Sequence, residues 1–150
     1  MNCKYKISVI MPTYNSERSI EESLKSLREQ DMDQTKLEIL IVDGGSTDRT
    51  LEIAKSYDCK ILHNEKKLPE FAKELGFLEA KGEWGIFLDS DEMMLSNSSF
   101  SRRLAFLEKH KRVKNLVSTG MSCAKDEEGI NRYANFIGDP FSNFVYRYNL

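Results

Sequence analysis

The sequence predicts an α/β fold, in which a mostly parallel sheet carries helices on both of its faces. Short apolar runs alternate along the chain with segments in which apolar residues recur at helical spacing. The run at residues 37–42 is almost continuously apolar, as expected of a central strand that is covered on both faces. With 150 residues, the chain is expected to form one globular domain with a real core.

The first part of the chain predicts a strand, a helix and a second strand. Residues 6–11 form a short apolar strand, and residues 37–42 form the next one. Ser19, with Glu22 three positions later, predicts a capping box at the start of the intervening helix. The apolar residues that mark one face of this helix are Ile20, Leu24 and Leu27.

A second helix and a weaker strand are predicted next. Residues 46–50 (STDRT) offer N-cap candidates for the helix. Residues 59–62 predict a third strand. The helical residues expected to point inward are Leu51, Ile53, Ala54 and Tyr57.

The later elements continue the alternation. Pro69 suits the first position of a third helix, which ends before Gly82. Residues 84–88 predict a fourth strand and residues 115–119 a fifth. The apolar positions of the third helix are Phe71, Leu75 and Leu78, and those of the fourth are Phe100, Leu104 and Leu107.

Composition argues against several classes of protein. The net charge is −2, with basic and acidic residues interspersed, which argues against a nucleic-acid-binding protein. No apolar run approaches the roughly 18 residues of a membrane-spanning helix. The three cysteines, at positions 3, 59 and 123, are scattered, so a zinc centre is not expected. The expected location is the cytoplasm, with the inner face of the membrane left open.

Two pairs of acids have the same spacing but different positions in the predicted sheet. Asp89 and Asp91 follow the strand at residues 84–88, whereas Asp31 and Asp33 precede the strand at residues 37–42. Open parallel sheets bind ligands outside the carboxyl ends of their strands. We therefore expect Asp89 and Asp91 to lie at a site and the other pair to form a solvated turn.

Two more strand ends add polar groups to the same predicted edge. The strand at residues 37–42 is followed by Asp43 and two glycines, which allow the backbone to approach a ligand closely. An aromatic ring beside a carboxylate suits a nucleobase, because the ring stacks on the base and the carboxylate accepts a base N–H. The residues that follow the first strand include Pro12, Thr13, Tyr14, Asn15 and Glu17.

Three stretches carry a family resemblance: ISVIMPTYNSE, EILIVDGGSTDRT and GIFLDSDE. In this order and spacing they resemble the inverting family 2 glycosyltransferases, which have the GT-A fold. The resemblance covers roughly the first two-thirds of the chain. It implies transfer of a sugar with inversion from a nucleotide-diphosphate sugar, with UDP as the default nucleotide, to an acceptor that the sequence does not identify.

The resemblance also implies roles for particular residues. Asp89 would lie near the ribose and diphosphate, and Asp91 would be the main protein ligand of Mg²⁺ or Mn²⁺, with Asp89 beside it. Such hard cations bind one or two carboxylates together with substrate phosphates. Lys73 stands where the family carries an arginine and would neutralise a phosphate. The nucleotide-binding set is Pro12, Thr13, Tyr14, Glu17, Asp43, Lys73, Asp89 and Ser90.

Each role has a simpler structural alternative. Asp43 is also explained as a turn residue before Gly44, and Tyr14 as a half-buried ring closing the first strand. Glu17 is also explained as a surface acid near a helix start, and Lys73 as a solvated helix residue. Asp89 and Asp91 could form a charged loop with an N-cap.

The catalytic base is not assigned by the sequence. An inverting transfer needs a carboxylate that takes the proton of the acceptor hydroxyl, and the chain after Glu108 offers few acids. None of them is assigned as the base: Asp126, Glu127, Glu128 and Asp139. A non-catalytic nucleotide-sugar-binding module or subunit is therefore the alternative. A dinucleotide-binding domain explains the sequence less well, because no G-x-G-x-x-G motif follows the first strand.

The chain is expected to be short of a full catalytic unit. Residues 1–150 would form one GT-A-like domain, with donor binding in about residues 1–110 and the start of an acceptor half in 111–150. The aromatic residues near the C-terminus are expected to lie in the core or in an interface, which could be one between copies of this chain. A surface that faces the acceptor or a membrane is the less favoured alternative. A docked C-terminal strand would show the same pattern. These aromatics are Phe141, Phe144, Tyr146 and Tyr148.

Overall fold

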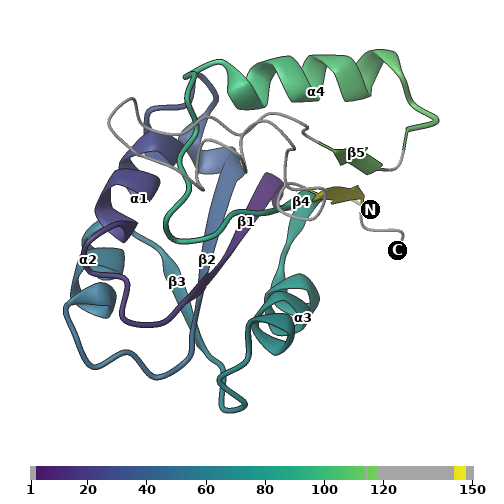
Figure 1. Ribbon diagram of the computed structural model, residues 1–150. Helices are drawn as coiled ribbons and strands as arrows, with labels where there is room; N and C mark the ends of the chain where they lie inside the picture. The colour runs from purple at the N-terminus through teal and green to yellow at the C-terminus, as the bar shows by residue number, and fades with distance from the viewer. Residues whose placement is uncertain (1–2, 114, 118–143, 148–150) are drawn as a thin grey trace, which may run out of the picture.

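The computed structural model describes residues 3–113, 115–117 and 144–147. It contains a six-stranded sheet in the order β3-β2-β1-β4-β6-β5, with helices packed against it (Figure 1). The strands are β1 (Tyr5–Thr13), β2 (Leu37–Asp43), β3 (Lys60–His63), β4 (Gly82–Phe87), β5 (Asn115–Val117) and β6 (Phe144–Arg147). The helices are α1 (Ile20–Arg28), α2 (Thr50–Ser56), α3 (Pro69–Glu79) and α4 (Ser99–Lys109), with a 3-10 turn, η1, at Gln34–Lys36.

The predicted parallel sheet is confirmed for the first four strands. β1 lies at the centre and pairs in parallel with both β2 and β4, and β3 extends the sheet beyond β2. Every residue of β2 is buried, which agrees with its continuous apolar run. The short α/β connections bring consecutive strands to the same orientation, as the alternating pattern predicts.

The far edge of the sheet differs from the prediction. The described part of the strand predicted at residues 115–119 is Asn115–Val117, and it does not pair with β4. Instead β6 lies between β4 and β5 and runs antiparallel to both. Residues 144–147 therefore form a strand docked on the sheet, which was one of the interpretations of the aromatic C-terminal segment. Phe141 and Tyr148 lie outside the described residues.

The two faces of the sheet bury separate apolar clusters. On one face, alternate residues of β1 and β2, such as Val9 and Ile41, pack with α1, α2 and α4. On the other face, Ile10, Leu40 and Val42 pack with α3. Side chains alternate between the faces of a strand, so each central strand contributes to both clusters. Helices on both faces are thus confirmed.

The predicted buried face of α3 is partly wrong. Leu78 is 74% exposed, and the buried residues of the helix are Ala72 and Gly76. A β-carbon on Gly76 would lie 2.3 Å from Ile10 Cγ2, so the glycine lets the helix approach the sheet closely. The small residues determine which side of α3 faces the sheet, while Phe71 and Leu75 are half-buried at its margins.

The capping box predicted at the start of α1 is wrong. α1 begins near Ser19 as predicted, but the Ser19 side chain makes no capping hydrogen bond, so the capping box is absent. α2 begins at Thr50, whose backbone N–H donates to Asp48 Oδ1 over 3.0 Å. Of the residues predicted to point inward from α2, Ala54 is buried. The others are half-buried: Leu51, Ile53 and Tyr57.

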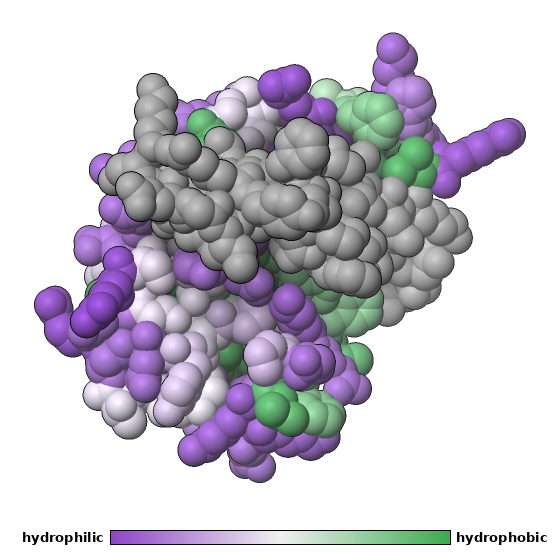
Figure 2. Space-filling model, viewed as in Figure 1, coloured by the Kyte–Doolittle hydropathy of each residue, from purple (hydrophilic) through white to green (hydrophobic). Residues whose placement is uncertain are grey.

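The described surface is mostly polar on the face shown in Figure 2, where apolar residues form small separate groups. The large apolar side chains exposed to solvent include Leu68, Leu78, Met93, Leu95 and Phe106. Within the described residues, no helix is both long and apolar enough to span a bilayer.

Candidate functional site

The carboxyl ends of β1, β2 and β4 meet at one edge of the sheet. Thr13 at the end of β1 lies opposite Asp43 at the end of β2. Beyond β4, the Leu88 N–H donates to Ile10 O over 3.1 Å, which keeps the chain beside β1 up to the acids. The strand ends thus bring Asp43 and the segment starting at Asp89 to the same edge, as expected.

The second acid pair lies elsewhere, in the turn before β2. Asp33 Oδ1 accepts hydrogen bonds from Thr35 N and Thr35 Oγ1, at 2.9 and 2.7 Å. The Thr35 hydroxyl is the main cause that lowers the pKa of Asp33. Asp33 is therefore explained by turn structure, and both acids of the pair are exposed, as predicted.

Asp43 organises the turn that follows β2. Its side chain is buried, with the residue 2% exposed. Oδ2 accepts from Gly45 N and Ser46 N, at 2.8 and 2.9 Å. Oδ1 accepts from Ser46 Oγ at 2.5 Å and from Thr13 Oγ1 at 3.4 Å. The turn alternative for Asp43 is thus structurally satisfied, and a ligand N–H would compete with the Ser46 hydroxyl.

Asn15 connects the loops after β1 and β2. It has a left-handed backbone, with φ at 49°, a conformation that asparagine adopts more readily than most residues. Its N–H donates to Ser46 Oγ, and its Oδ1 accepts from Thr47 N, both at 2.9 Å. The two strand ends therefore form one connected rim.

Tyr14 and Lys67 lie on either side of the glycine pair. Tyr14 is 62% exposed, which excludes the alternative of a half-buried ring. A β-carbon on Gly44 would lie 3.7 Å from Tyr14 Cδ2 and 3.8 Å from Lys67 Cα. A β-carbon on Gly45 would lie 3.7 Å from Lys67 Nζ. Gly44 is buried and Gly45 is half-buried, so the glycine pair is packed between an exposed ring and an ammonium group.

The acids after β4 form a closed turn. Glu92 N donates to Asp89 O over 3.0 Å, and Asp89 N donates back to Glu92 Oε2 over 3.1 Å. Lys73 on α3 places its Nζ 3.4 Å from Asp89 Oδ1. Asp91 is exposed and forms no ion pair with any other described residue. Glu92 is thus hydrogen-bonded within the turn, Asp89 is paired with Lys73, and Asp91 is accessible to solvent.

Glu92 has the strongest electrostatic signature in this turn. Burial raises the pKa of its carboxyl group to about 7. The backbone N–H of Asp89 opposes this increase, and the negative charges of Asp89 and Asp91 add to it. Repulsion among neighbouring carboxylates therefore contributes to the raised pKa of Glu92.

The acid turn suits a hard divalent cation that is shared with a substrate. Within the described ranges, no three His, Cys, Asp or Glu residues gather into a complete metal cage. Asp91 offers an accessible carboxylate with Asp89 two residues away, and carboxylate oxygens are the ligands Mg²⁺ and Mn²⁺ prefer. The donor set fits such an ion if phosphate oxygens complete its coordination.

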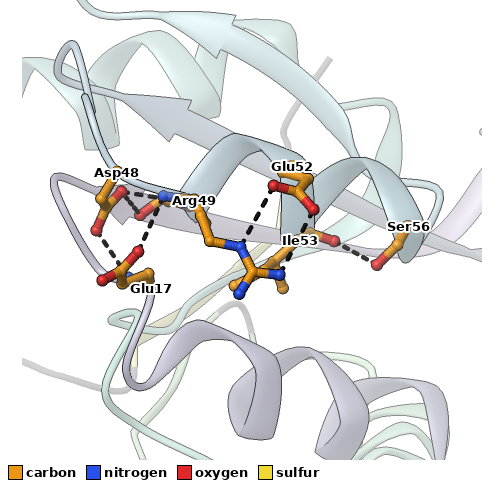
Figure 3. A network of polar contacts seen from close by, with 7 residues as sticks. Glu17, Asp48, Arg49, Glu52, Ile53 and Ser56 are labelled. Carbon is orange, nitrogen blue, oxygen red and sulfur yellow. Dashed lines mark hydrogen bonds and ion pairs between the residues drawn. The ribbon is translucent and has the colours of Figure 1, made fainter.

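Two predicted nucleotide-binding residues have partners within the protein. Ser90 Oγ lies 2.8 Å from Ser16 Oγ, at the start of α1. Glu17 Oε2 accepts from Arg49 N over 3.1 Å, and Glu17 N donates to Asp48 Oδ2 over the same distance (Figure 3). Glu17 therefore joins the start of α2, as in its structural alternative. Pro12 is half-buried in β1, next to Thr13.

Glu17 also lines a hollow of about 440 Å³ between α1 and α2. Its charged lining contains both signs, and Arg49 pairs with Glu52 at 3.4 Å (Figure 3). The hollow includes none of the acids that follow β4. Its lining residues are Glu17, Arg18, Glu21, Arg49, Glu52, Ile53 and Ser56.

Sequence reasoning assigned no role to Lys67 or Glu92. The signal for Lys67 was available, because two lysines, Lys66 and Lys67, stand in the loop before Pro69. The signal for Glu92 was a third acid directly after Asp91. The candidate catalytic acids fall outside the described residues: Asp126, Glu127, Glu128 and Asp139.

Comparison with known proteins identifies the family. The poly(ribitol-phosphate) β-N-acetylglucosaminyltransferase TarS of Staphylococcus aureus is 37% identical over 111 residues, which cover 70% of this chain and 19% of TarS. A crystal structure of S. aureus TarS 1–349 in complex with UDP superposes with a TM-score of 0.78. It is 29% identical and covers 95% of this chain and 46% of that chain.

A more distant structure agrees on the fold. The mannosyltransferase PcManGT of Pyrobaculum calidifontis, solved with GDP-Man and Mn²⁺, has a TM-score of 0.71 and 22% identity, covering 95% of this chain and 44% of that one. The family model described as "Glycosyl transferase family 2" matches residues 8–147. The chain therefore has the GT-A fold and belongs to glycosyl transferase family 2.

Proposed function

We propose that this chain binds a nucleotide-diphosphate sugar, with UDP as the default nucleotide, and contributes the donor site of a metal-assisted, inverting glycosyltransferase. The observation that carries the proposal is the meeting of Asp43, Lys73 and the acids after β4 at one sheet edge. The TarS fragment that binds UDP has the same fold at 29% identity. Because the chain spans only part of its relatives, activity is proposed for the whole protein.

The nucleoside would occupy the rim between β1 and β2. The exposed ring of Tyr14 offers a stacking surface beside the glycine pair, Gly44 and Gly45. Asp43 would accept a base N–H after the Ser46 hydroxyl turns away, and Lys67 would donate to a carbonyl of the base. Pro12 and Thr13 would form the strand end beneath the nucleoside.

The diphosphate would lie over the acid turn. Lys73 carries a positive charge beside Asp89, and Asp91 has its carboxylate accessible. A bound Mg²⁺ or Mn²⁺ would stabilise the charge that develops on the leaving diphosphate. Asp91 would hold the ion with Asp89 beside it, Lys73 would contact a phosphate, and Ser90 would shape the backbone between the two acids.

The acceptor half and the base complete the proposal. We place donor binding in about residues 1–110 and the start of the acceptor half in residues 111–150, with the base outside the described residues. The acceptor would be a glycan, lipid or protein. A non-catalytic binding module remains the second candidate, because none of the described acids is assigned as the base.

Calorimetry tests donor binding. UDP binding in the presence of Mn²⁺ should weaken at least about tenfold with EDTA or with Asp91→Asn, since the cation links the phosphates to the acids. Asp31→Asn is the matched control, because Asp31 belongs to the acid pair at the other edge. Equal affinity with and without metal would contradict the metal assignment. Transfer and hydrolysis assays with several nucleotide sugars would then separate an enzyme from a binding module.

A further inference from the structure

Helix α1 and the residues that flank it carry a row of polar side chains along the segment after β4. Ser26 Oγ accepts from Met94 N over 3.0 Å, and Gln30 Nε2 donates to Ser96 O over 2.9 Å. Gln30 Oε1 also accepts from Phe100 N over 3.1 Å. Residues three, four and seven positions apart share one face of a helix. The row consists of Ser16, Ser23, Ser26 and Gln30.

Within this row, Ser23 is the member of α1 that contacts the acid turn. The residue is 1% exposed. Its Oγ lies 3.0 Å from Ser90 O and 2.5 Å from Glu92 O. These two carbonyls belong to the residues on either side of Asp91. A hydroxyl has one proton, so the two carbonyls share it as acceptors.

This contact restricts the backbone that carries Asp91. The turn is closed by the reciprocal hydrogen bonds between Asp89 and Glu92. Ser23 ties both neighbours of Asp91 to a helix that is itself packed in the core through Leu24 and Leu27. The backbone position from which the Asp91 side chain projects is thus fixed before any ligand arrives. Groups that orient a metal ligand in this way raise metal affinity.

We propose that Ser23 is a positioning residue for Asp91 and thereby sets the affinity of the acid turn for its divalent cation. This inference rests on the metal assignment in the proposed function. Ser23 acts through the backbone carbonyls of Ser90 and Glu92 and does not contact the cation or the nucleotide. Its removal should change metal binding while leaving metal-free nucleotide binding unchanged.

The test compares two serine substitutions on the same helix. Ser23→Ala removes the hydroxyl that holds both neighbours of Asp91, whereas Ser26→Ala removes a contact to Met94, three residues further on. Mn²⁺ binding is measured by electron paramagnetic resonance with saturating UDP present. UDP binding in EDTA and the thermal midpoint are measured for each variant.

We expect Ser23→Ala to weaken Mn²⁺ binding about 10-fold or more, as removal of a group that orients a metal ligand typically does. Ser26→Ala should bind Mn²⁺ like the wild type, even if its thermal midpoint falls by a similar amount. If Ser23→Ala does not fold, Ser23→Cys leaves no cavity, replaces the hydroxyl with a slightly larger thiol that is a weaker donor, and should also weaken Mn²⁺ binding.

Three results would count against the proposal. Wild-type Mn²⁺ affinity in Ser23→Ala or Ser23→Cys would overturn the role of Ser23 and leave the proposed function intact. An equal loss in Ser26→Ala would show that the helix contact is only structural. If UDP did not change the affinity of the wild-type protein for Mn²⁺, the metal assignment would fail, and this inference would fail with it.

Discussion

Lys73 Nζ lies 3.4 Å from Asp89 Oδ1, and this ion pair joins α3 to the turn after β4 across the edge of the sheet. The sequence left open whether Lys73 is only a solvated helix residue. The pair neutralises one acid of the turn and leaves Asp91 accessible. Lys73 therefore balances one acid of the turn, and in the proposed function it would also contact a phosphate.

Replacing Lys73 should weaken donor binding more than it weakens the fold. Both partners are partly exposed, so loss of the pair should cost at most about 1 kcal/mol of unfolding free energy. We expect Lys73→Met to weaken UDP binding by about tenfold in calorimetry, because a charge contact to phosphate is lost. Lys73→Arg should retain binding. Lys25→Met on α1 is the control, and an equal loss there would point to a nonspecific charge effect.

Replacing Lys67 should change which nucleobase is preferred. An ammonium group donates hydrogen bonds only, so it favours the carbonyl oxygens of uracil and guanine over the amino groups of cytosine and adenine. In Lys67→Met, the preference for UDP over CDP should decrease several-fold in competition binding, by about 1 kcal/mol. Lys66→Met is the matched neighbour, because Lys66 Nζ lies 3.6 Å from the centre of the Phe71 ring. An unchanged preference in Lys67→Met would exclude Lys67 as a base contact.

Adding one methyl group to Gly76 should destabilise the protein strongly. Its β-carbon would lie 2.3 Å from Ile10 Cγ2 and 3.1 Å from Val42 Cγ2, so α3 would have to move away from the sheet. Overpacking of this kind costs about 1–3 kcal/mol. Urea unfolding of Gly76→Ala should show that loss. Leu78→Ala, on the exposed side of the same helix, should change stability by less than about 0.5 kcal/mol, and equal losses would contradict the packing assigned to α3.

Cys59 should react slowly with thiol reagents. Burial raises the pKa of the Cys59 thiol to about 11, from the ordinary value of 9.0, whereas Cys3 is exposed. In a Cys123→Ser background at pH 8, iodoacetamide should modify Cys3 first, as followed by mass spectrometry. Fast labelling of Cys59 in the folded protein would contradict its burial.

The same thiol makes stability depend on pH. Between pH 9 and about 11, the unfolded chain loses the Cys59 proton while the folded chain keeps it. The contribution of this group is therefore present below pH 9 and decreases as pH rises through that range. Cys59→Ala should flatten this part of the curve of unfolding free energy against pH. An identical slope in the variant would contradict the raised pKa of the Cys59 thiol in the folded protein.

The sequence predicted what depends on local pattern. The apolar runs placed β1, β2 and β4, and the order of strand ends placed Asp43 and Asp89 at one edge. It could not place β6, because pairing between residues far apart in the chain leaves no local signal. It misjudged α3, because close packing of Gly76 outweighed the larger apolar residues. It offered the turn role of Asp43 only as an alternative, because the pattern does not show that Gly45 N and Ser46 Oγ donate to its carboxylate.

The position of β6 has a consequence for how the chain is made. The sheet is assembled out of sequence order, since β5 joins it only through β6, which is synthesised later. Until residue 147 has left the ribosome, the edge of β4 that β6 will occupy has no strand from the described part of the chain to pair with it. An unpaired strand edge can pair with other chains. The nascent protein therefore passes through a stage in which β1 to β4 have been synthesised but the sheet edge at β4 is open to chaperones or to aggregation.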